Sequence, residues 1–447
     1  MIKDFFYTNI IKASILFGVL CLPIILPAQI ITTIVGDGRG TFGGDGGFAS
    51  KASLSTPNGI VLDKIGNIYI SDSKGSKIRK VNTSGIISTI AGWGSAGMSG
   101  DGGPATAAKL NFPSGILIDN SGNIIFSDSY NHRIRKIDSA GIITTIVGTG
   151  IGGYTSDDTL AIHSRLNIPC GLALDDEGNL YIADRMNHRI RKVNTSGVIT
   201  TVAGNGLGTT KGDGGPATSA SINRPNDVKI SPDGALIIAD TYGNAVRKIK
   251  ADGIIKSIAG VGDGFSGFGG DEGVIGESRL ASPYSLAIDN TGNIYVADKN
   301  NNRIRRIDVT GAIKTVAGNG ASVSGGDGRV AVDASISSPE SIAVDEVGNL
   351  YIGETSKIRY LYLKDYKNEA KISFMPNPCF KSTTIFLSSM YGEMVTISIY
   401  NTQGQLMSTT EGPTNRNITL EFVSAGTYRV VAISKHGKWS GSVVVLQ

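Results

Sequence analysis

Residues 113–148 read PSGILIDNSGNIIFSDSYNHRIRKIDSAGIITTIVG and contain four short apolar runs separated by turns rich in Gly, Asn and Asp. The runs cover residues 115–118, 123–127, 132–137 and 142–147. Strand-length runs joined by turns of this kind predict antiparallel hairpins. The segment is therefore expected to form one four-stranded antiparallel sheet.

The same unit is written six times along the chain. A proline opens each copy, at spacings of 56, 56, 56, 58 and 56 residues: Pro57, Pro113, Pro169, Pro225, Pro283 and Pro339. A glycine, an acid and an arginine follow in register, as Gly66, Asp72 and Arg79 do in the first copy. Six four-stranded antiparallel units without a helical pattern predict an all-β fold, a six-bladed β-propeller.

Closure of the propeller is also predicted. The sixth copy has only three strand signals before residue 364, whereas residues 30–36 read IITTIVG, which is identical to residues 142–148. We expect this first strand to complete the last blade, because an unpaired edge strand invites association with other chains. The predicted propeller spans residues 30–363.

The N-terminus is typical of a secretory signal. Lys3 and Lys12 precede an apolar run over residues 13–26, which is shorter than the ~20 residues that a membrane-spanning helix needs. We expect residues 1–28 to be a signal peptide cleaved after Ala28, leaving no transmembrane segment; a retained signal anchor is the alternative. The cysteines, Cys21, Cys170 and Cys379, lack the paired spacing of a disulfide framework or a zinc motif.

The C-terminal part differs in style from the repeats. Residues 364–370 are a charged stretch that we interpret as a linker, and short alternating runs bounded by Asn/Gly turns over residues 371–447 predict a small C-terminal β-sandwich. FMPNP (374–378), NTQGQL (401–406) and AGTYRVVAI (425–433) resemble the C-terminal sorting domain of type IX secretion cargo of Bacteroidota. An ordinary fibronectin-like accessory module is the alternative.

That resemblance implies an export address, normally cleaved during export, and makes the type IX secretion machinery a partner. The expected location is secreted, extracellular or at the outer-membrane surface. For residues 30–363, ADRMNHRIRK (183–192), SDSYNHRIRK (127–136) and GDGGPAT (100–106 and 212–218) resemble NHL repeats. NHL propellers include protein- and RNA-binding modules, extracellular sensors and a few lyases, so the fold alone does not identify the function.

Residues that recur in every copy are expected to belong to the scaffold. We expect the Asp72 and Arg79 series to pair across a hairpin, and His132 and His188 to occupy a structural slot of the repeat; His163 lies alone in a loop. A second acidic ring lies in the long loops, and it could build turns or bind calcium: Asp45, Asp101, Asp157, Asp213, Asp271 and Asp327.

The candidate site is where the sixfold pattern breaks. The residue after each repeat proline varies, and so does the one after it, where blade four has Asp227. These positions are expected to surround one mouth of the central channel and to bind a ligand; alternatively, a wet channel tolerates any polar residue. The six that follow the prolines are Asn58, Ser114, Cys170, Asn226, Tyr284 and Glu340.

The sequence favours a secreted or cell-surface, non-catalytic binding propeller with an extracellular protein or glycan ligand. No catalytic residue and no metal site are assigned, and Cys170 is interpreted as an inert filler because no histidine lies in register with it. The alternative is a calcium-dependent lactonase- or lyase-like enzyme, in which Asn226, Asp227 and Glu340 would supply oxygen ligands. Nucleic acid is not expected, because a net charge of +4 offers no concentrated positive face.

Overall fold

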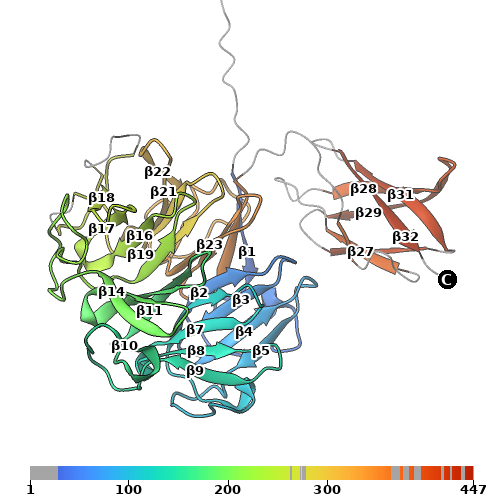
Figure 1. Cartoon of the computed structure of the whole chain (residues 1–447). Coiled ribbons are helices and arrows are strands. Elements are labelled where there is room, and N and C mark those ends of the chain that lie inside the picture. The colour runs from blue at the N-terminus through green and yellow to red at the C-terminus, as the bar shows by residue number, and fades with distance from the viewer. Residues whose placement is uncertain are drawn as a thin grey trace, which may run out of the picture.

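The fold is seen in a computed structural model (Figure 1). The structure describes residues 29–363 except 262–263, 272 and 274–277, and in the C-terminal part residues 373–375, 382–386, 394–413, 417–422, 425–433 and 438–445. The predicted signal peptide (1–28), the predicted linker (364–370), Cys21 and Cys379 lie outside the described residues. Within them, no helix has the length and apolar character needed to cross a membrane.

The repeats form six antiparallel sheets, or blades, whose strands follow chain order from the inside outward. Blades one to three contain β2 (Pro57–Leu62), β3 (Ile68–Asp72), β4 (Lys77–Val81) and β5 (Ile87–Ala91); β6 (Pro113–Ile118), β7 (Ile124–Asp128), β8 (Arg133–Ile137) and β9 (Ile143–Val147); and β11 (Pro169–Leu174), β12 (Leu180–Asp184), β13 (Arg189–Val193) and β14 (Val198–Ala203).

Blades four to six repeat the arrangement. Their strands are β15 (Asp227–Ile230), β16 (Leu236–Asp240), β17 (Ala245–Ile249) and β18 (Ile255–Ala259); β19 (Pro283–Ile288), β20 (Ile294–Asp298), β21 (Arg303–Ile307) and β22 (Ile313–Ala317); and β23 (Ser341–Val344), β24 (Leu350–Gly353), β25 (Ile358–Leu361) and β1 (Ile31–Val35). One additional strand of two residues, β10 (Thr159–Leu160), extends blade three beyond its predicted four strands by pairing with β14.

The N-terminal strand closes the ring. β1 pairs antiparallel with β25, with Ile31 opposite Leu361 and Val35 opposite Ile358 (Figure 1). Ile31 is buried in a cluster with Leu361 of blade six, and Val35 in a cluster that joins Ile358 of blade six to blade one. This is the pairing that the repeated IITTIVG segment predicts, and it leaves β25 without a free edge.

Neighbouring blades pack through apolar side chains and are joined by hydrogen bonds near the axis. Phe126 of blade two packs with Tyr69 and Ile78 of blade one in one of the clusters between sheets. A hydrogen bond joins each blade to the next. Four of these bonds run from a hydroxyl to the carbonyl of a repeat proline: Ser73 to Pro113, Ser129 to Pro169 (2.6 Å), Thr241 to Pro283 (2.8 Å) and Ser341 to Pro57 (2.6 Å). The other two run from a backbone N–H, Gly171 N to Asn226 O (2.9 Å) and Ile342 N to Ser285 Oγ (3.3 Å).

The glycine of the hairpin between the first and second strands of each blade has a positive φ, from 76° at Gly234 to 95° at Gly348. An L-residue with a side chain would be strained there. The residue before each repeat proline also has a positive φ, although none of the six is glycine: Thr56, Phe112, Ile168, Arg224, Ser282 and Ser338.

The C-terminal residues form two sheets. One contains β26 (Ser373–Met375), β27 (Ser382–Phe386) and β30 (Asn417–Glu421), and the other β29 (Leu406–Pro413), β28 (Met394–Tyr400), β31 (Gly426–Ile433) and β32 (Lys438–Val445). Ile418 and Leu420 of the first sheet share a buried core with Ile397 and Val430 of the second. Two antiparallel sheets with a common core are a β-sandwich, as the sequence predicts.

Candidate ligand-binding site in the central channel

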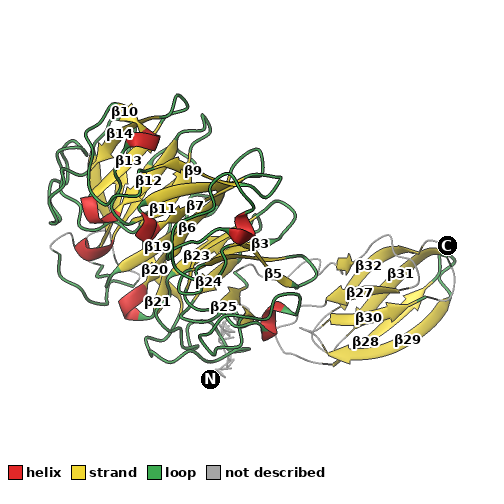
Figure 2. Cartoon of the chain, turned by 90° about the horizontal axis from the view of Figure 1, so that it is seen from below, coloured by secondary structure: helices red, strands yellow, loops and turns green. Residues whose placement is uncertain are grey.

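The innermost strands of the six blades surround a cavity. β2, β6, β11, β15, β19 and β23 contact one another in that order, and β23 contacts β2, so the ring is complete. Figure 2 shows β6, β11, β19 and β23 gathered at the centre of the propeller. The cavity between the strands has a volume of about 380 Å³, which is in the range of small-molecule binding sites.

The structure places most of the predicted site residues in this cavity. Asn58, Ser114, Cys170, Asn226 and Asp227 line it. All five are buried, with exposed fractions of 3–8%. Tyr284 and Glu340 are not among the residues that line it.

Tyr284 is buried and does not offer an exposed aromatic surface to a ligand. Its side chain is only 9% exposed, and Lys299 Nζ lies 4.2 Å from the ring centroid. Burial raises the pKa of the Tyr284 hydroxyl, Cys170 and Glu340 raise it further, and Asn58 is among the groups that lower it. The polar residues next to the repeat prolines of blades one to four are buried as well. The end that we predicted as the mouth is therefore lined by buried residues.

The cavity opens at the other end of the innermost strands. The last residue of each strand is aliphatic, part-exposed and lines the cavity: Leu62, Ile118, Leu174, Ile230, Ile288 and Val344. The strands thus run from a buried polar floor to an apolar opening beside the hairpins that join first and second strands. Burial by Tyr284 and the neighbouring loops, which no residue spacing reveals, is the physical reason for the difference from the predicted mouth.

Blade four places a charged pair in the cavity wall. Lys229 Nζ lies 2.7 Å from Asp227 Oδ1 and donates to the Leu172 carbonyl at 3.3 Å. Asp227 Oδ2 accepts from Leu286 N (2.8 Å) and Ser285 Oγ (3.1 Å). The pair therefore links blades three, four and five, and the two residues are the charged ones among those that line the cavity.

The sequence analysis missed Lys229, although a signal for it exists. The equivalent position is apolar in every other blade: Val61, Leu117, Ala173, Ala287 and Ala343. Comparing the innermost strands over their whole length, rather than only the two positions after the proline, would have found it.

Asn226 carries an acceptor without a donor at the floor of the cavity. Its Nδ2 donates to the Tyr284 carbonyl at 3.0 Å, which fixes the orientation of the amide. Its Oδ1 is buried and has no hydrogen-bond partner among the described residues. Because buried polar atoms are nearly always hydrogen-bonded, this oxygen is suited to a donor group on a ligand.

The oxygen ligands of the calcium alternative are not gathered in the structure. Both Asp227 oxygens accept hydrogen bonds, and Glu340 Oε1 lies 2.8 Å from Lys299 Nζ. Asn226 and Asp227 line the cavity, whereas Glu340 does not. Within the described part of the chain, no group of three or more His, Cys, Asp or Glu side chains is arranged to hold a metal ion.

Cys170 and the two repeat histidines have structural surroundings. Burial raises the pKa of the Cys170 thiol, which disfavours the reactive thiolate. His132 Nδ1 accepts a hydrogen bond from Ile168 N, and His188 Nδ1 accepts one from Arg224 N, both at 3.2 Å. Each histidine thus holds the strained residue before the next repeat proline.

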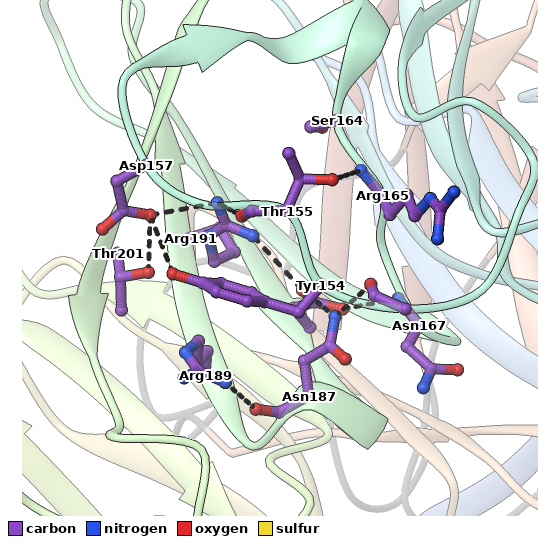
Figure 3. A network of polar contacts seen from close by, with 12 residues as sticks. Tyr154, Thr155, Asp157, Ser164, Arg165, Asn167, Asn187, Arg189, Arg191 and Thr201 are labelled. Atoms are coloured by element: carbon purple, nitrogen blue, oxygen red, sulfur yellow. Dashed lines mark hydrogen bonds and ion pairs between the residues drawn. The ribbon is translucent and has the colours of Figure 1, made fainter.

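Five of the six loop acids lie in tight turns, as predicted, and all six also pair with a buried arginine, which we did not predict. Arg191 is fully buried, and its guanidinium lies 3.7 Å from Asp184. On its other side it lies 3.1 Å from the loop residue Asp157, to which Thr201 donates a hydrogen bond (Figure 3). The Tyr154 ring covers the guanidinium, 4.9 Å from its carbon. The other blades repeat the arrangement of one arginine and two acids with Arg79, Arg135, Arg247, Arg305 and Arg359.

Comparison with known families agrees with this geometry. The Teneurin NHL domain model matches residues 38–99 and 94–156, and the NHL repeat model matches residues 166–193 and 280–307. The model of a secretion system C-terminal sorting domain matches residues 373–446. This chain is an NHL-repeat propeller with a C-terminal sorting domain. The sorting domain indicates export by type IX secretion to the cell surface or the extracellular space.

Relatives of this NHL propeller protein are much longer chains. Teneurin-1 of Homo sapiens is 33% identical over 232 residues, which cover 46% of this chain and 8% of the teneurin. Protein SUPPRESSOR OF QUENCHING 1, chloroplastic, of Arabidopsis thaliana is 30% identical over 330 residues, which cover 70% of this chain and 31% of that protein. The match therefore spans well under two thirds of either relative.

Solved structures share the architecture of the NHL propeller protein. A Bacteroides thetaiotaomicron protein of unknown function aligns with a TM-score of 0.56 at 18% identity, covering 75% of this chain and 76% of that one. An auxiliary nutrient binding protein from the same organism aligns with a TM-score of 0.55 at 16% identity, covering 75% and 76%. At these identities the likeness shows the fold alone.

Proposed function

We propose that this chain is an exported, non-catalytic binding protein whose propeller takes a ligand in its central channel. The observation that carries the proposal is the cavity of about 380 Å³, which has buried residues at the Tyr284 end and part-exposed aliphatic residues at the other. An apolar pocket with a few polar groups at its floor is the usual form of a small-ligand site.

The shape of the channel restricts the ligand. A protein surface or a branched glycan cannot enter a cavity bounded by six strands, whereas a small molecule or the end of an unbranched chain can. The repeated scaffold supports a binding role, because its buried charges are paired with one another in every blade. Export, which the sorting domain indicates, supports a role for this site outside the cell.

A cavity-filling variant tests the proposal. Ala343 lines the cavity and is part-exposed, so Ala343→Trp should block it, whereas Val347→Trp on the exposed neighbouring hairpin should not. The protein and both variants are incubated with a small-molecule extract of growth medium and examined by native mass spectrometry. We expect bound masses that are lost in Ala343→Trp and kept in Val347→Trp; equal binding by all three proteins would contradict the proposal.

Metal content separates this proposal from the calcium-dependent enzyme. The purified protein is analysed for bound calcium, and lactone hydrolysis is measured with and without a chelator. Binding that survives the chelator supports a non-catalytic propeller. One bound calcium per chain together with chelator-sensitive hydrolysis would favour the enzyme instead.

A further inference from the structure

The open end of the channel is rimmed by acids. The hairpins that join first and second strands, residues 63–67, 119–123, 175–179, 231–235, 289–293 and 345–349, contain one basic residue, Lys64. They contain nine acidic residues: Asp63, Asp119, Asp175, Asp176, Glu177, Asp233, Asp289, Asp345 and Glu346. All six hairpins contribute to this acidic rim, so it encircles the opening.

Hydrogen bonds keep the rim ionised. Although burial raises the pKa of Asp63, Asp175 and Asp289, hydrogen bonds from the Asn side chain and backbone of the same turn hold each pKa below its usual value. For Asp233, the hydrogen bond from Lys248 is the largest cause of a pKa lowered to about 2. These carboxylates are therefore charged at any pH near neutrality.

Lysines offset part of the charge of the rim: Lys64 lies on the rim, and two other lysines pair with its acids from farther out. Lys192 Nζ lies 3.9 Å from Asp175, and Lys248 Nζ lies 2.8 Å from Asp233. Both lysines are on the third strands, two strands away from the channel wall. Asp176, Glu177 and Glu346 are exposed. Carboxylates around a low-dielectric opening focus a negative potential on it.

The floor of the cavity favours the same kind of ligand group. Asn226 lines the cavity, and its Oδ1 is a buried acceptor without a hydrogen-bond partner among the described residues. Lys229, the cation in the wall, is neutralised by Asp227 at 2.7 Å. From Asn226 to Ile230 at the opening, the strand rises about 13 Å, at about 3.3 Å per residue. The wall between them is mainly aliphatic.

We propose that the channel selects a cationic ligand with an apolar body, whose ammonium or other N–H-bearing group enters first and reaches Asn226. This inference rests on the proposed channel function and adds the sign of the ligand's charge. The acidic rim attracts the cation, the aliphatic wall takes the apolar body, and Asn226 Oδ1 accepts the donor. An anion of the same shape is repelled by the acidic rim. It also cannot accept a hydrogen bond from Asn226 Oδ1, because that atom is itself an acceptor.

Three probes with one apolar body test the proposal. 4-Phenylbutylammonium, 4-phenylbutanol and 4-phenylbutyrate are titrated into the full exported chain by calorimetry at low salt. We expect the ammonium probe to bind at least about tenfold more tightly than the carboxylate, with the alcohol between them, and the preference to shrink at high salt because exposed charges are screened.

Rim variants identify the source of the preference. Asp176→Asn, Glu177→Gln and Glu346→Gln together should narrow the ammonium-to-carboxylate ratio at least about threefold, since each removed charge weakens the focused potential. The matched control, Asp158→Asn with Asp252→Asn and Asp333→Asn, removes three exposed charges of the propeller outside these hairpins and should leave the ratio unchanged.

Failure of this inference can be told from failure of the proposed function. If the alcohol binds and Ala343→Trp abolishes its binding, but the ammonium and carboxylate bind equally, the channel is a binding site without charge selection and the inference is wrong. If no probe binds, or if Ala343→Trp binds all three like the unmodified chain, both the inference and the channel site are wrong.

Discussion

At the scale of single residues, the buried arginines hold the repeat together. Arg191 has no exposed surface and contacts a fully buried acid, Asp184, and a half-exposed one, Asp157. Removing one partner of a buried ion pair leaves the other charge without compensation, which costs far more than the loss of an exposed pair. The repeated arginine is therefore scaffold, and the varied residues are free to specify a ligand.

This arrangement gives the first prediction. Arg191→Met should lower the free energy of unfolding of the propeller by about 3–5 kcal/mol, because Asp184 is then buried without its cation. Lys192→Met, on the same strand but with its side chain 30% exposed, should change it by less than about 1 kcal/mol. Denaturant unfolding measures both. Equal effects of the two substitutions would show that the buried pair is not what stabilises the blade.

Sequence reasoning identified the scaffold residues but not all of their partners. The repeat spacing distinguished recurring residues such as Arg79 and Asp72 from the variable positions. The structure confirms that Arg79 and Asp72 pair, at 3.7 Å. That Asp45 also reaches Arg79, at 2.7 Å, was missed, because 34 residues separate them and only the folded loop brings them together. Lys229 was missed because the comparison stopped two residues into the strand.

At the scale of elements, hairpin periodicity was sufficient to predict the blades. Turns of fixed spacing set the register of neighbouring strands, and the duplicated IITTIVG segment identified β1 as the partner of β25. β10 was not predicted, because two residues carry no period. The positive φ at the residue before each repeat proline was also not foreseen, since a residue before proline normally avoids the helical region.

The second prediction concerns β1. Starting the chain at Gly36 removes Ile31 and Val35 from the core of the last blade and exposes β25 as an edge. We expect aggregation or loss of cooperative unfolding, measured by light scattering and calorimetry. Removal of residues 371–447 is the control, because the sandwich has a core of its own. A monomeric Gly36 variant with an unchanged melting midpoint would contradict the closure.

At the scale of the whole molecule, the repeated buried acids should shape the pH dependence of stability. Burial raises the pKa of Asp72, Asp128, Asp184 and Asp298 to about 6 and that of Asp240 to about 7. Unfolded aspartate titrates near 3.9, so between about pH 4 and 7 the folded protein binds more protons than the unfolded chain. The free energy of unfolding should therefore fall as the pH rises through this window.

The third prediction follows from both groups of acids. Below about pH 4, the lowered pKa values of the rim acids, such as Asp233 and Asp63, act in the opposite direction and stability falls as they are protonated. We expect maximal stability near pH 4–5, measured by denaturant titration across pH 3–8. Asp240→Asn should flatten the decline above pH 5. Stability that increases steadily from pH 4 to 7 would contradict the buried-acid account.

The channel was predictable in outline only. Six blades imply an axial channel, and five of the seven predicted site residues line it. Which end is open depends on which residues the folded loops and side chains bury, such as Tyr284, and no spacing of residues reveals that. The acidic composition of the six hairpins is visible in the sequence. That these hairpins surround the opening of the cavity is seen only in the structure.

A crystal structure of the exported chain with 4-phenylbutylammonium tests the central claim most directly. Binding in the channel through the acidic rim predicts density for the probe among the six innermost strands, with its nitrogen within hydrogen-bonding distance of Asn226 Oδ1 and its phenyl ring against the aliphatic residues at the opening. Density on the Tyr284 side of the propeller, or an empty channel at saturating probe, would contradict it.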